Sequence, residues 1–143
     1  MITIAKLSTF QRNNLNAIKV FQSKKIEDFS MVIMENFYPK FKVKRIFQIE
    51  SSKSQKRGEH AHIKCSQIFL CVKGEILLEC ADGRSRAKFN LNSESNMAVL
   101  VPNGIWTSQI YQPGSELIVL CNTIFEEQDY IRSWNHFLIA KKI

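Results

Sequence analysis

The chain has 143 residues, of which 45% are hydrophobic and 23% are charged, a composition typical of a globular domain. Its formal charge of +7 suits an anionic partner such as a phosphorylated small molecule, a nucleic acid or a membrane surface. No segment approaches the roughly twenty apolar residues that span a bilayer, and the N-terminus lacks the apolar run of a signal peptide. We therefore expect a single cytoplasmic domain over residues 1–143.

Short segments rich in β-branched and aromatic residues, separated by polar or glycine-containing turns, dominate the chain. The first part, up to about residue 29, is mixed and contains one candidate edge strand at residues 16–21. A turn is expected at residues 38–40 and a polar loop at residues 51–56. The other predicted strands are 29–37, 43–49, the segment that holds His60 and His62, 67–72, 75–80, 84–91, 97–101, 106–111 and 116–122. Many short strands at close spacing indicate a β-sandwich or barrel.

The pattern changes near the C-terminus. Residues 126–142 lack Gly and Pro, begin with acids and end with lysines, as expected of a helix in a favourable orientation of its dipole. Tyr130, Trp134, Phe137 and Leu138 would share one helical face. This predicts a C-terminal helix, about 126–140, that packs on the sheet.

The four cysteines lie in apolar segments and have no CxxC spacing. This distribution favours buried thiols in a reducing compartment over a zinc site or a disulfide framework. These residues are Cys65, Cys71, Cys80 and Cys121.

The segment 57–64 is the most informative stretch for chemistry, because it holds two of the three histidines, one residue apart. On an extended strand the period of two places His60 and His62 on the same face, and Lys64 can follow them there. Arg57 and Lys64 flank the pair with positive charge. Imidazoles accept and donate protons near neutral pH, so we consider His60 and His62 candidate proton carriers.

The spacing around these histidines resembles the two sequence motifs of the cupins, which are small antiparallel β-barrels or jelly rolls. Metal-binding cupins hold their ion with three histidines and a glutamate. Here two of those positions are Gln67 and Thr107, whose neutral side chains are weak ligands. The resemblance implies an all-β jelly roll with a C-terminal α-helix and no bound metal. The first motif is matched by His60, His62, Gln67 and Gly74, and the second by Pro102, Gly104 and Thr107.

A narrower resemblance links three segments to the nucleotide-sugar 3,4-ketoisomerases. Residues 57–64 (RGEHAHIK) resemble the family signature RGxHAHxK, residues 125–132 (FEEQDYIR) are similar to YDExDYIR, and residues 44–47 (KRIF) to KRVY. The resemblance implies an enzyme without a cofactor that converts dTDP-4-keto-6-deoxy-D-glucose into a dTDP-3-keto-6-deoxyhexose. Such products serve the synthesis of aminated sugars for surface polysaccharides. It also implies a homodimer, commonly with N-terminal strands exchanged between subunits.

Within that reading, moving the carbonyl from C4 to C3 requires proton transfers at carbon and oxygen. The residues leave open which imidazole acts at carbon; we favour His62 as the base and His60 as its acid/base or orienting partner. The other candidate substrate-binding residues would contact the pyrophosphate, the developing enediolate, a sugar oxygen or the wall of the sugar pocket. They are Arg45, Arg57 and Lys64 for the negative charges, Gln67 for the sugar oxygen, and Trp106 for the pocket wall.

Several alternatives stay open. Arg45 could form a structural ion pair with Glu35 or Glu50, and Trp106 could belong to the core. A non-catalytic cupin that binds a nucleotide sugar, or a metal-dependent cupin enzyme, would retain much of the same pattern. Nucleic-acid binding is disfavoured, because the lysines are dispersed and no basic, aromatic reading motif accompanies them.

Overall fold

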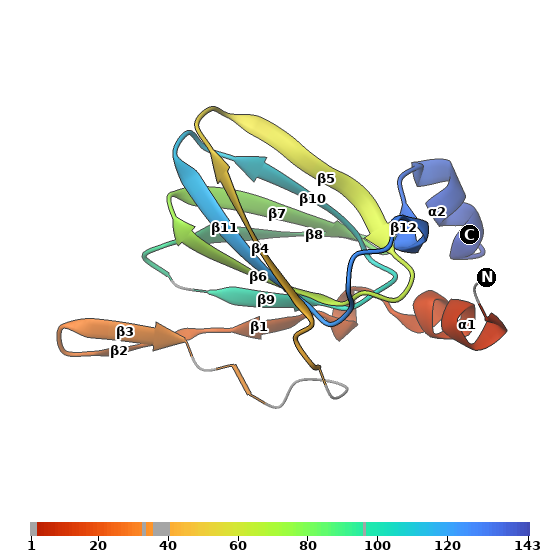
Figure 1. Ribbon diagram of the computed structural model, residues 1–143, viewed down its shortest axis with the longest axis horizontal. Helices are drawn as coiled ribbons and strands as arrows, with labels where there is room; N and C mark the ends of the chain where they lie inside the picture. The colour runs from red at the N-terminus through yellow and green to blue at the C-terminus, as the bar shows by residue number, and fades with distance from the viewer. Residues whose placement is uncertain (1–2, 33, 36–40, 96) are drawn as a thin grey trace.

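The computed structural model describes residues 3–32, 34–35, 41–95 and 97–143, which form a barrel of two antiparallel sheets with two short helices at one end (Figure 1). In chain order the elements are α1 (Ile4–Arg12), a 3₁₀ turn (Leu15–Ala17), β1 (Lys19–Phe21), β2 (Ser23–Ile26), β3 (Phe29–Val32), β4 (Arg45–Ser51), β5 (Gln55–His62), β6 (Gln67–Lys73), β7 (Glu75–Ala81), β8 (Arg86–Asn92), β9 (Ala98–Val101), β10 (Trp106–Tyr111), β11 (Ser115–Cys121), a 3₁₀ turn (Glu127–Asp129), β12 (Tyr130–Ile131) and α2 (Trp134–Ala140).

The two sheets have the strand orders β1-β9-β6-β11-β4 and β12-β5-β10-β7-β8. We call them the β4 sheet and the β5 sheet. Strand β11 shows how the sequence builds them, because its residues alternate between fully and partly buried along its whole length. The inward residues of both sheets form one apolar core, which includes Phe69, Leu78, Val99 and Leu117. The predicted all-β jelly-roll class is therefore confirmed.

Most predicted strands appear within two residues of their expected bounds. Of the segment 16–21, only Lys19–Phe21 is a strand, and a 3₁₀ turn precedes it. Strand β3 ends at Val32; residues 33 and 36–40, which include the expected turn at 38–40, lie outside the described residues. All four cysteines are free and buried, as predicted.

The predicted start of the C-terminal helix was wrong. Helix α2 begins at Trp134, where Ser133 caps it by accepting a hydrogen bond from the backbone N–H of His136. Upstream, the backbone N–H of Ile63 donates to Asp129 at 2.9 Å, and β12 pairs with β5. Partners on β5 thus satisfy backbone groups that a longer helix would have bonded internally. Tyr130 consequently lies on a strand and shares no helical face with Phe137.

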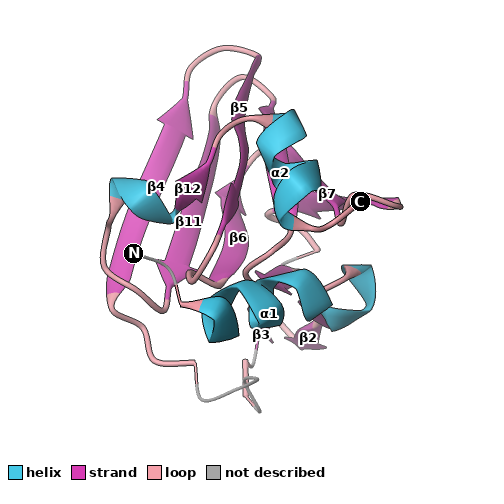
Figure 2. Cartoon of the chain, turned by 90° about the vertical axis from the view of Figure 1, so that its right-hand side faces the viewer, coloured by secondary structure: helices cyan, strands magenta, loops and turns pink. Residues whose placement is uncertain are grey.

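The two helices lie together at one end of the barrel (Figure 2), although α1 was not predicted. Phe10 of α1 and Phe137 of α2 are fully buried and meet edge to face, with ring centroids 6.0 Å apart. The buried Nζ of Lys141 donates hydrogen bonds to the backbone carbonyls of Phe10, Asn13 and Gly104. None of the helices in the described part of the chain is long and apolar enough to span a bilayer.

Strands β2 and β3 form a separate hairpin that extends away from the barrel beyond β1 (Figure 1). Within the described part of the chain, these strands pair only with each other, from Ser23 opposite Val32 to Ile26 opposite Phe29. A two-stranded hairpin is marginally stable by itself in water. In the described structure, the outer edges of the hairpin therefore have no strand partner.

Candidate active site

A cavity of about 170 Å³ lies inside the barrel, and three of the predicted site residues, Arg57, His60 and Gln67, line it. Its walls come from strands of both sheets, and polar side chains project among apolar ones. A concave site in which several polar groups converge among apolar ones is typical of a small-molecule site. The lining residues are Phe47, Ile49, Arg57, Gly58, His60, Gln67, Phe69, Gln109, Val119 and Tyr130.

A β-bulge at Gly58 and Glu59 places both Arg57 and His60 at this cavity. Opposite β5, Thr107 pairs with His60 and the next residue, Ser108, pairs with Gly58, so Glu59 is an extra residue in the strand. Both bulge residues have left-handed backbones, with φ of 87° at Gly58 and 59° at Glu59. A regular strand would point residues 57 and 60 to opposite faces. The extra residue in the bulge reverses this alternation, so the exposed Arg57 lines the same cavity as His60.

His60 lines the cavity as a neutral imidazole. Its ring centroid is 4.9 Å from that of His62 and 4.9 Å from that of Tyr130. Burial and the adjacent His62 lower the pKa of His60 to about 4. Its Nδ1 is buried, and no described residue hydrogen-bonds to it. His60 can therefore exchange hydrogen bonds with a ligand at neutral pH without carrying a charge.

His62 and Asp129 form a buried pair, with 2.9 Å between His62 Nδ1 and Asp129 Oδ2. Backbone N–H groups of Lys64 and Cys65 also donate to the carboxylate, at 2.6 and 3.3 Å. Burial acts to raise the pKa of Asp129, but the hydrogen bond from His62 and those from the backbone outweigh it, so the pKa is lowered. An ionised carboxylate only accepts hydrogen bonds, which places the proton of neutral His62 on Nδ1.

The Nε2 atom of His62 is consequently left as a lone-pair acceptor. It is buried and has no partner among the described residues. An imidazole oriented by a carboxylate through Nδ1, with Nε2 free, is the arrangement that general-base histidines use. Asp129 was not predicted as a site residue, because the segment around it has the pattern of a helix. The signal in the sequence that could have identified it is the resemblance of residues 125–132 to a family signature.

Tyr130 is a second site residue that the sequence analysis misplaced. Strand β12 sets Tyr130 opposite His62, and its ring centroid lies 4.4 Å from that of His62. Tyr130 also lines the cavity. The three rings of His60, His62 and Tyr130 therefore form one cluster at the junction of β5 and β12.

Arg45 and Gln67 approach the cavity from the β4 sheet. Arg45 faces the interior, with its guanidinium 5.5 Å from the ring centroid of Phe47, and its Nη2 lies 3.4 Å from the sulfur of Cys121. Gln67 is buried and also donates to that sulfur, at 3.4 Å. No ion pair joins Arg45 to Glu35 or Glu50 in the described structure, because Glu50 points to the outer face of β4.

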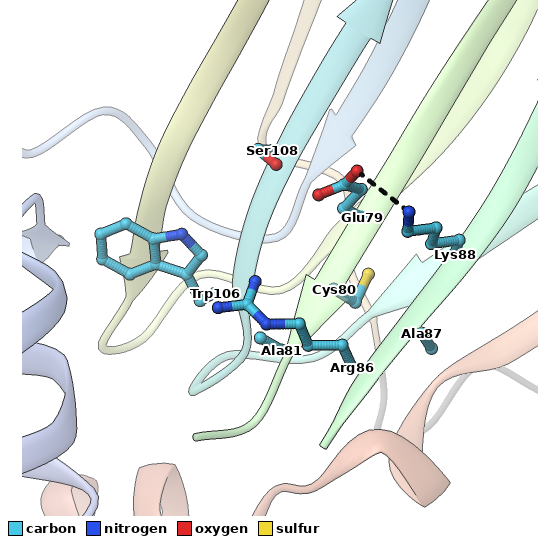
Figure 3. Close-up of a pocket in the computed structure, with 8 residues that line it drawn as sticks. All are labelled: Glu79, Cys80, Ala81, Arg86, Ala87, Lys88, Trp106 and Ser108. Atoms are coloured by element: carbon cyan, nitrogen blue, oxygen red, sulfur yellow. Dashed lines mark ion pairs between the residues drawn. The ribbon is translucent and has the colours of Figure 1, made fainter. Parts of the chain in front are cut away.

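Two predicted substrate-binding residues lie elsewhere. Strand β5 ends at His62, so the period of two does not extend to Lys64, whose Nζ pairs with Glu126 at 2.7 Å. Trp106 lies on the outer face of the β5 sheet, with its ring centroid 5.3 Å from that of Trp134. There it borders a small depression of about 20 Å³ together with Arg86, as Figure 3 shows. The structure therefore separates both residues from the histidine cavity.

Comparison with known proteins assigns the chain to a family. Residues 11–142 match the family described as FdtA: WxcM-like, C-terminal. The chain belongs to this family. A curated relative, the TDP-4-oxo-6-deoxy-alpha-D-glucose-3,4-oxoisomerase of Aneurinibacillus thermoaerophilus, is 30% identical over 125 residues, which cover 83% of this chain and 88% of the relative. The predicted resemblance to sugar 3,4-ketoisomerases is thus confirmed.

Solved structures of 3,4-ketoisomerases share the fold. A 3,4-ketoisomerase from Helicobacter canadensis is 27% identical, with a TM-score of 0.76, and the match covers 89% of this chain and 98% of that one. A histidine-to-asparagine mutant of the 3,4-ketoisomerase from Thermoanaerobacterium thermosaccharolyticum, solved in complex with TDP-4-keto-6-deoxyglucose, is 20% identical. Its TM-score is 0.76, and the match covers 90% of this chain and 96% of that one.

The side chains at the cupin ligand positions of this WxcM-like chain can be compared with the ligands that a transition metal prefers. Of the four cupin ligand positions, His60, His62 and Gln67 gather near the cavity, and Thr107 pairs with His60 across the sheet. Amide and hydroxyl groups are poor partners for a transition metal. Another possible donor group, His62 with Cys65 and Asp129, has its atoms within 4.8 Å of one another. Hydrogen bonds already occupy the carboxylate of that group, so we interpret it as a hydrogen-bonded unit.

Proposed function

We propose that this protein is a dTDP-sugar 3,4-ketoisomerase that converts dTDP-4-keto-6-deoxy-D-glucose into a dTDP-3-keto-6-deoxyhexose. The observation that carries the proposal is the His62–Asp129 pair, which leaves Nε2 of His62 without a partner among the described residues and sets the ring 4.9 Å from that of His60, a neutral imidazole that lines the cavity. The curated relative is named for the same reaction. The product would be a 3-keto sugar of the kind that is aminated for surface polysaccharides.

The reaction is a series of proton transfers at C3, O4, O3 and C4 that leaves the composition of the sugar unchanged. Nε2 of His62 removes the proton from C3, the C–H electrons form a C3=C4 double bond, and O4 takes up a proton to give an enediol. O3 then loses its proton, C4 gains one, and the carbonyl is at C3. The ionised Asp129 stabilises the imidazolium that forms on His62, as a carboxylate does in hydrolytic triads.

The neighbouring polar groups suit the oxygen side of this chemistry. His60 is neutral at pH 7 and can pass protons between O3 and O4, which lie on adjacent carbons. Gln67 can hydrogen-bond a sugar oxygen from the opposite sheet. The positive charge of Arg45 stabilises the negative charge that develops on the enediolate oxygens. Trp106 and Lys64 have no part in this proposed site.

The cavity is large enough for the sugar half of the substrate but not for the nucleotide half. At about 170 Å³ it is smaller than the roughly 300–1,000 Å³ of pockets that enclose a drug-sized ligand. It therefore suits the deoxyhexose ring, while the nucleotide remains outside. Arg57 is both exposed and part of the lining, a position from which its guanidinium can bind the pyrophosphate.

We further propose that the protein is one domain that acts as a homodimer. The support is the β2–β3 hairpin, which extends from the barrel with open strand edges. Docking the hairpin on a second copy of the chain would pair these edges and cover Met31, whose side chain is 38% exposed. Exchange of N-terminal strands between subunits is the simplest arrangement of this kind.

Incubation of chelator-treated protein with dTDP-4-keto-6-deoxyglucose in deuterated water, followed by NMR, tests the function. We expect deuterium exchange at C3 and the appearance of a 3-keto sugar. The His62→Asn variant should bind dTDP normally and show neither. Binding of dTDP without exchange would favour the non-catalytic cupin. Activity that chelation removes and a divalent metal restores would favour the metal-dependent cupin, and either outcome would overturn the proposal.

A further inference from the structure

Cys121 occupies an unusual position for a core thiol, because two polar side chains donate to its sulfur. On β11 it is the residue that pairs with Arg45 of β4 on one side and with Gln67 of β6 on the other. Arg45 Nη2 and Gln67 Nε2 each lie 3.4 Å from Sγ. The side chain of Cys121 is fully buried. Cys121 shares the inward face of β11 with Val119, which lines the cavity.

The positive charge of Arg45 is not neutralised by an acidic side chain in the described structure. In the described part of the structure, no carboxylate lies within ion-pair distance of this guanidinium. A partly buried cation is unfavourable unless an opposite charge or hydrogen bonds compensate for its lost hydration. Nη2 of Arg45 lies 3.4 Å from the sulfur of Cys121, and a thiolate there would supply a negative charge.

A second buried thiol lies beside the same sulfur. Cys65 interacts with Cys121, which raises the pKa of Cys65, and its own Sγ donates to the backbone carbonyl of Ser66 at 3.5 Å. The interaction with Cys65 lowers the pKa of Cys121 to about 6; burial opposes this effect, and Gln67 and Arg45 reinforce it. Two N–H donors, one of them cationic, converge on one sulfur, an arrangement that suits an acceptor without a proton.

We propose that Cys121 is a buried thiolate that serves as the counter-ion of Arg45 and holds Arg45 and Gln67 in position at the sugar cavity. It is a positioning residue, since it acts through these two side chains and does not itself line the cavity. Arg45 in turn interacts with Tyr130 and has a buried Nε without a described partner. The thiolate therefore orients donors toward the ring cluster. This inference rests on the proposed ketoisomerase function.

The thiolate itself can be observed without any turnover, through the ultraviolet absorbance of thiolates near 240 nm. We expect the folded wild-type protein to show one thiolate that titrates with a midpoint near pH 6. Cys121→Ser should remove this signal. The matched control Cys71→Ser should retain it, because Cys71 donates to the backbone carbonyl of Lys73 at 3.3 Å and has no cationic neighbour among its described contacts. A titration that persists in Cys121→Ser, or none below pH 8 in wild type, would overturn the inference.

A second variant protects the test against a folding failure of Cys121→Ser. Arg45→Met leaves the thiol in place and removes its counter-ion, so the midpoint of the thiolate signal should move up by at least one pH unit. An unchanged midpoint in a folded Arg45→Met protein would show that Arg45 and Cys121 are not a charge pair. Circular dichroism at each pH establishes that the barrel is intact during the titration.

The effect on turnover tests positioning. Cys121→Ala should lower kcat about tenfold or more, the effect of losing one hydrogen bond to a charged group, with dTDP affinity within about twofold. Cys121→Ser, which keeps an acceptor, should recover part of the loss. Full activity of Cys121→Ala would overturn the positioning role. If wild type shows no isomerase activity but the pH 6 thiolate is present, the proposed function fails while the charge pair stands.

Discussion

Asp129 Oδ2 lies 2.9 Å from Nδ1 of His62, and this contact joins residues 67 positions apart in the chain. The pairing of β12 with β5 brings them together, and it aligns Tyr130 with His62 in the same step. The short strand β12 therefore places a carboxylate and a phenol beside the imidazole. The Asp129 carboxylate engages Nδ1 of His62 and leaves Nε2 without a partner among the described residues.

The first prediction concerns this carboxylate. Asp129→Asn should lower kcat by roughly 10²–10⁴-fold, because an amide can hold the wrong imidazole tautomer and cannot stabilise imidazolium. Steady-state kinetics with the 4-keto sugar would measure the loss. Glu126→Gln is a control on the same segment, since Glu126 pairs with Lys64 outside the cavity. Equal kinetic losses in the two variants would contradict the role given to Asp129.

The second prediction concerns pH and stability. Burial and the adjacent His62 lower the pKa of His60 from 6.5 to about 4. Between these values the unfolded chain binds a proton that the folded chain does not, so stability is complete above about pH 6.5 and falls as the pH drops toward 4. The shift corresponds to about 3 kcal/mol at most. Asp129 acts in the same direction at still lower pH, because its pKa is also lowered.

Denaturant unfolding at several pH values between 7 and 4 measures this slope. His60→Gln should flatten it, because the titrating group is gone. His136→Gln is the matched control, since His136 is exposed on α2 and should leave the slope unchanged. A slope that is the same in wild type and His60→Gln would assign the pH dependence to other groups.

The third prediction tests the bulge. Gly58→Ala would place a Cβ 3.0 Å from Gln109 Nε2 and 3.1 Å from the backbone oxygen of Thr107, at a φ of +87°. We expect a loss of stability of about 1–3 kcal/mol. We also expect a large loss of turnover, because the bulge sets the direction in which the side chains of Arg57 and His60 point. Thermal unfolding and kinetics measure both effects.

Gly114→Ala separates backbone strain from crowding in that experiment. Gly114 has a similar φ of +79°, but a Cβ there would meet nothing within 4 Å. This variant should lose some stability through strain alone and should keep its turnover. If both variants retain full activity, the bulge does not control the site.

The fourth prediction concerns the hairpin. Light scattering coupled to size-exclusion chromatography should give twice the mass of the 16.6 kDa chain for wild type. Replacement of residues 23–32 by a short Gly/Ser linker should give a folded monomer, because the proposed partner surface is removed. A monomeric wild type would contradict the dimer, and a dimeric hairpin variant would place the interface elsewhere.

The strands could be predicted well because alternation and turn residues are local signals. Strand β10 has the expected bounds, and the two histidines share a face as their spacing required. The misses came from information that is not local. The bulge at Gly58 shifts the period-two pattern, and tertiary pairing with β5 overrode the helical character of residues 126–131. Trp106 could not be assigned to a face of the sheet from its residue type, because both faces carry aromatic residues.

The ammonium group of Lys141 connects the end of α2 to the strand that carries His62. It donates to the carbonyl of Gly104, whose own N–H donates to the carbonyl of His62 at 2.9 Å. Two hydrogen bonds in series therefore connect Lys141 to the backbone of His62. Trimming the final three residues, or fusing a bulky tag after Ile143, should loosen α1, α2 and the His62 backbone as one cooperative unit of hydrogen exchange.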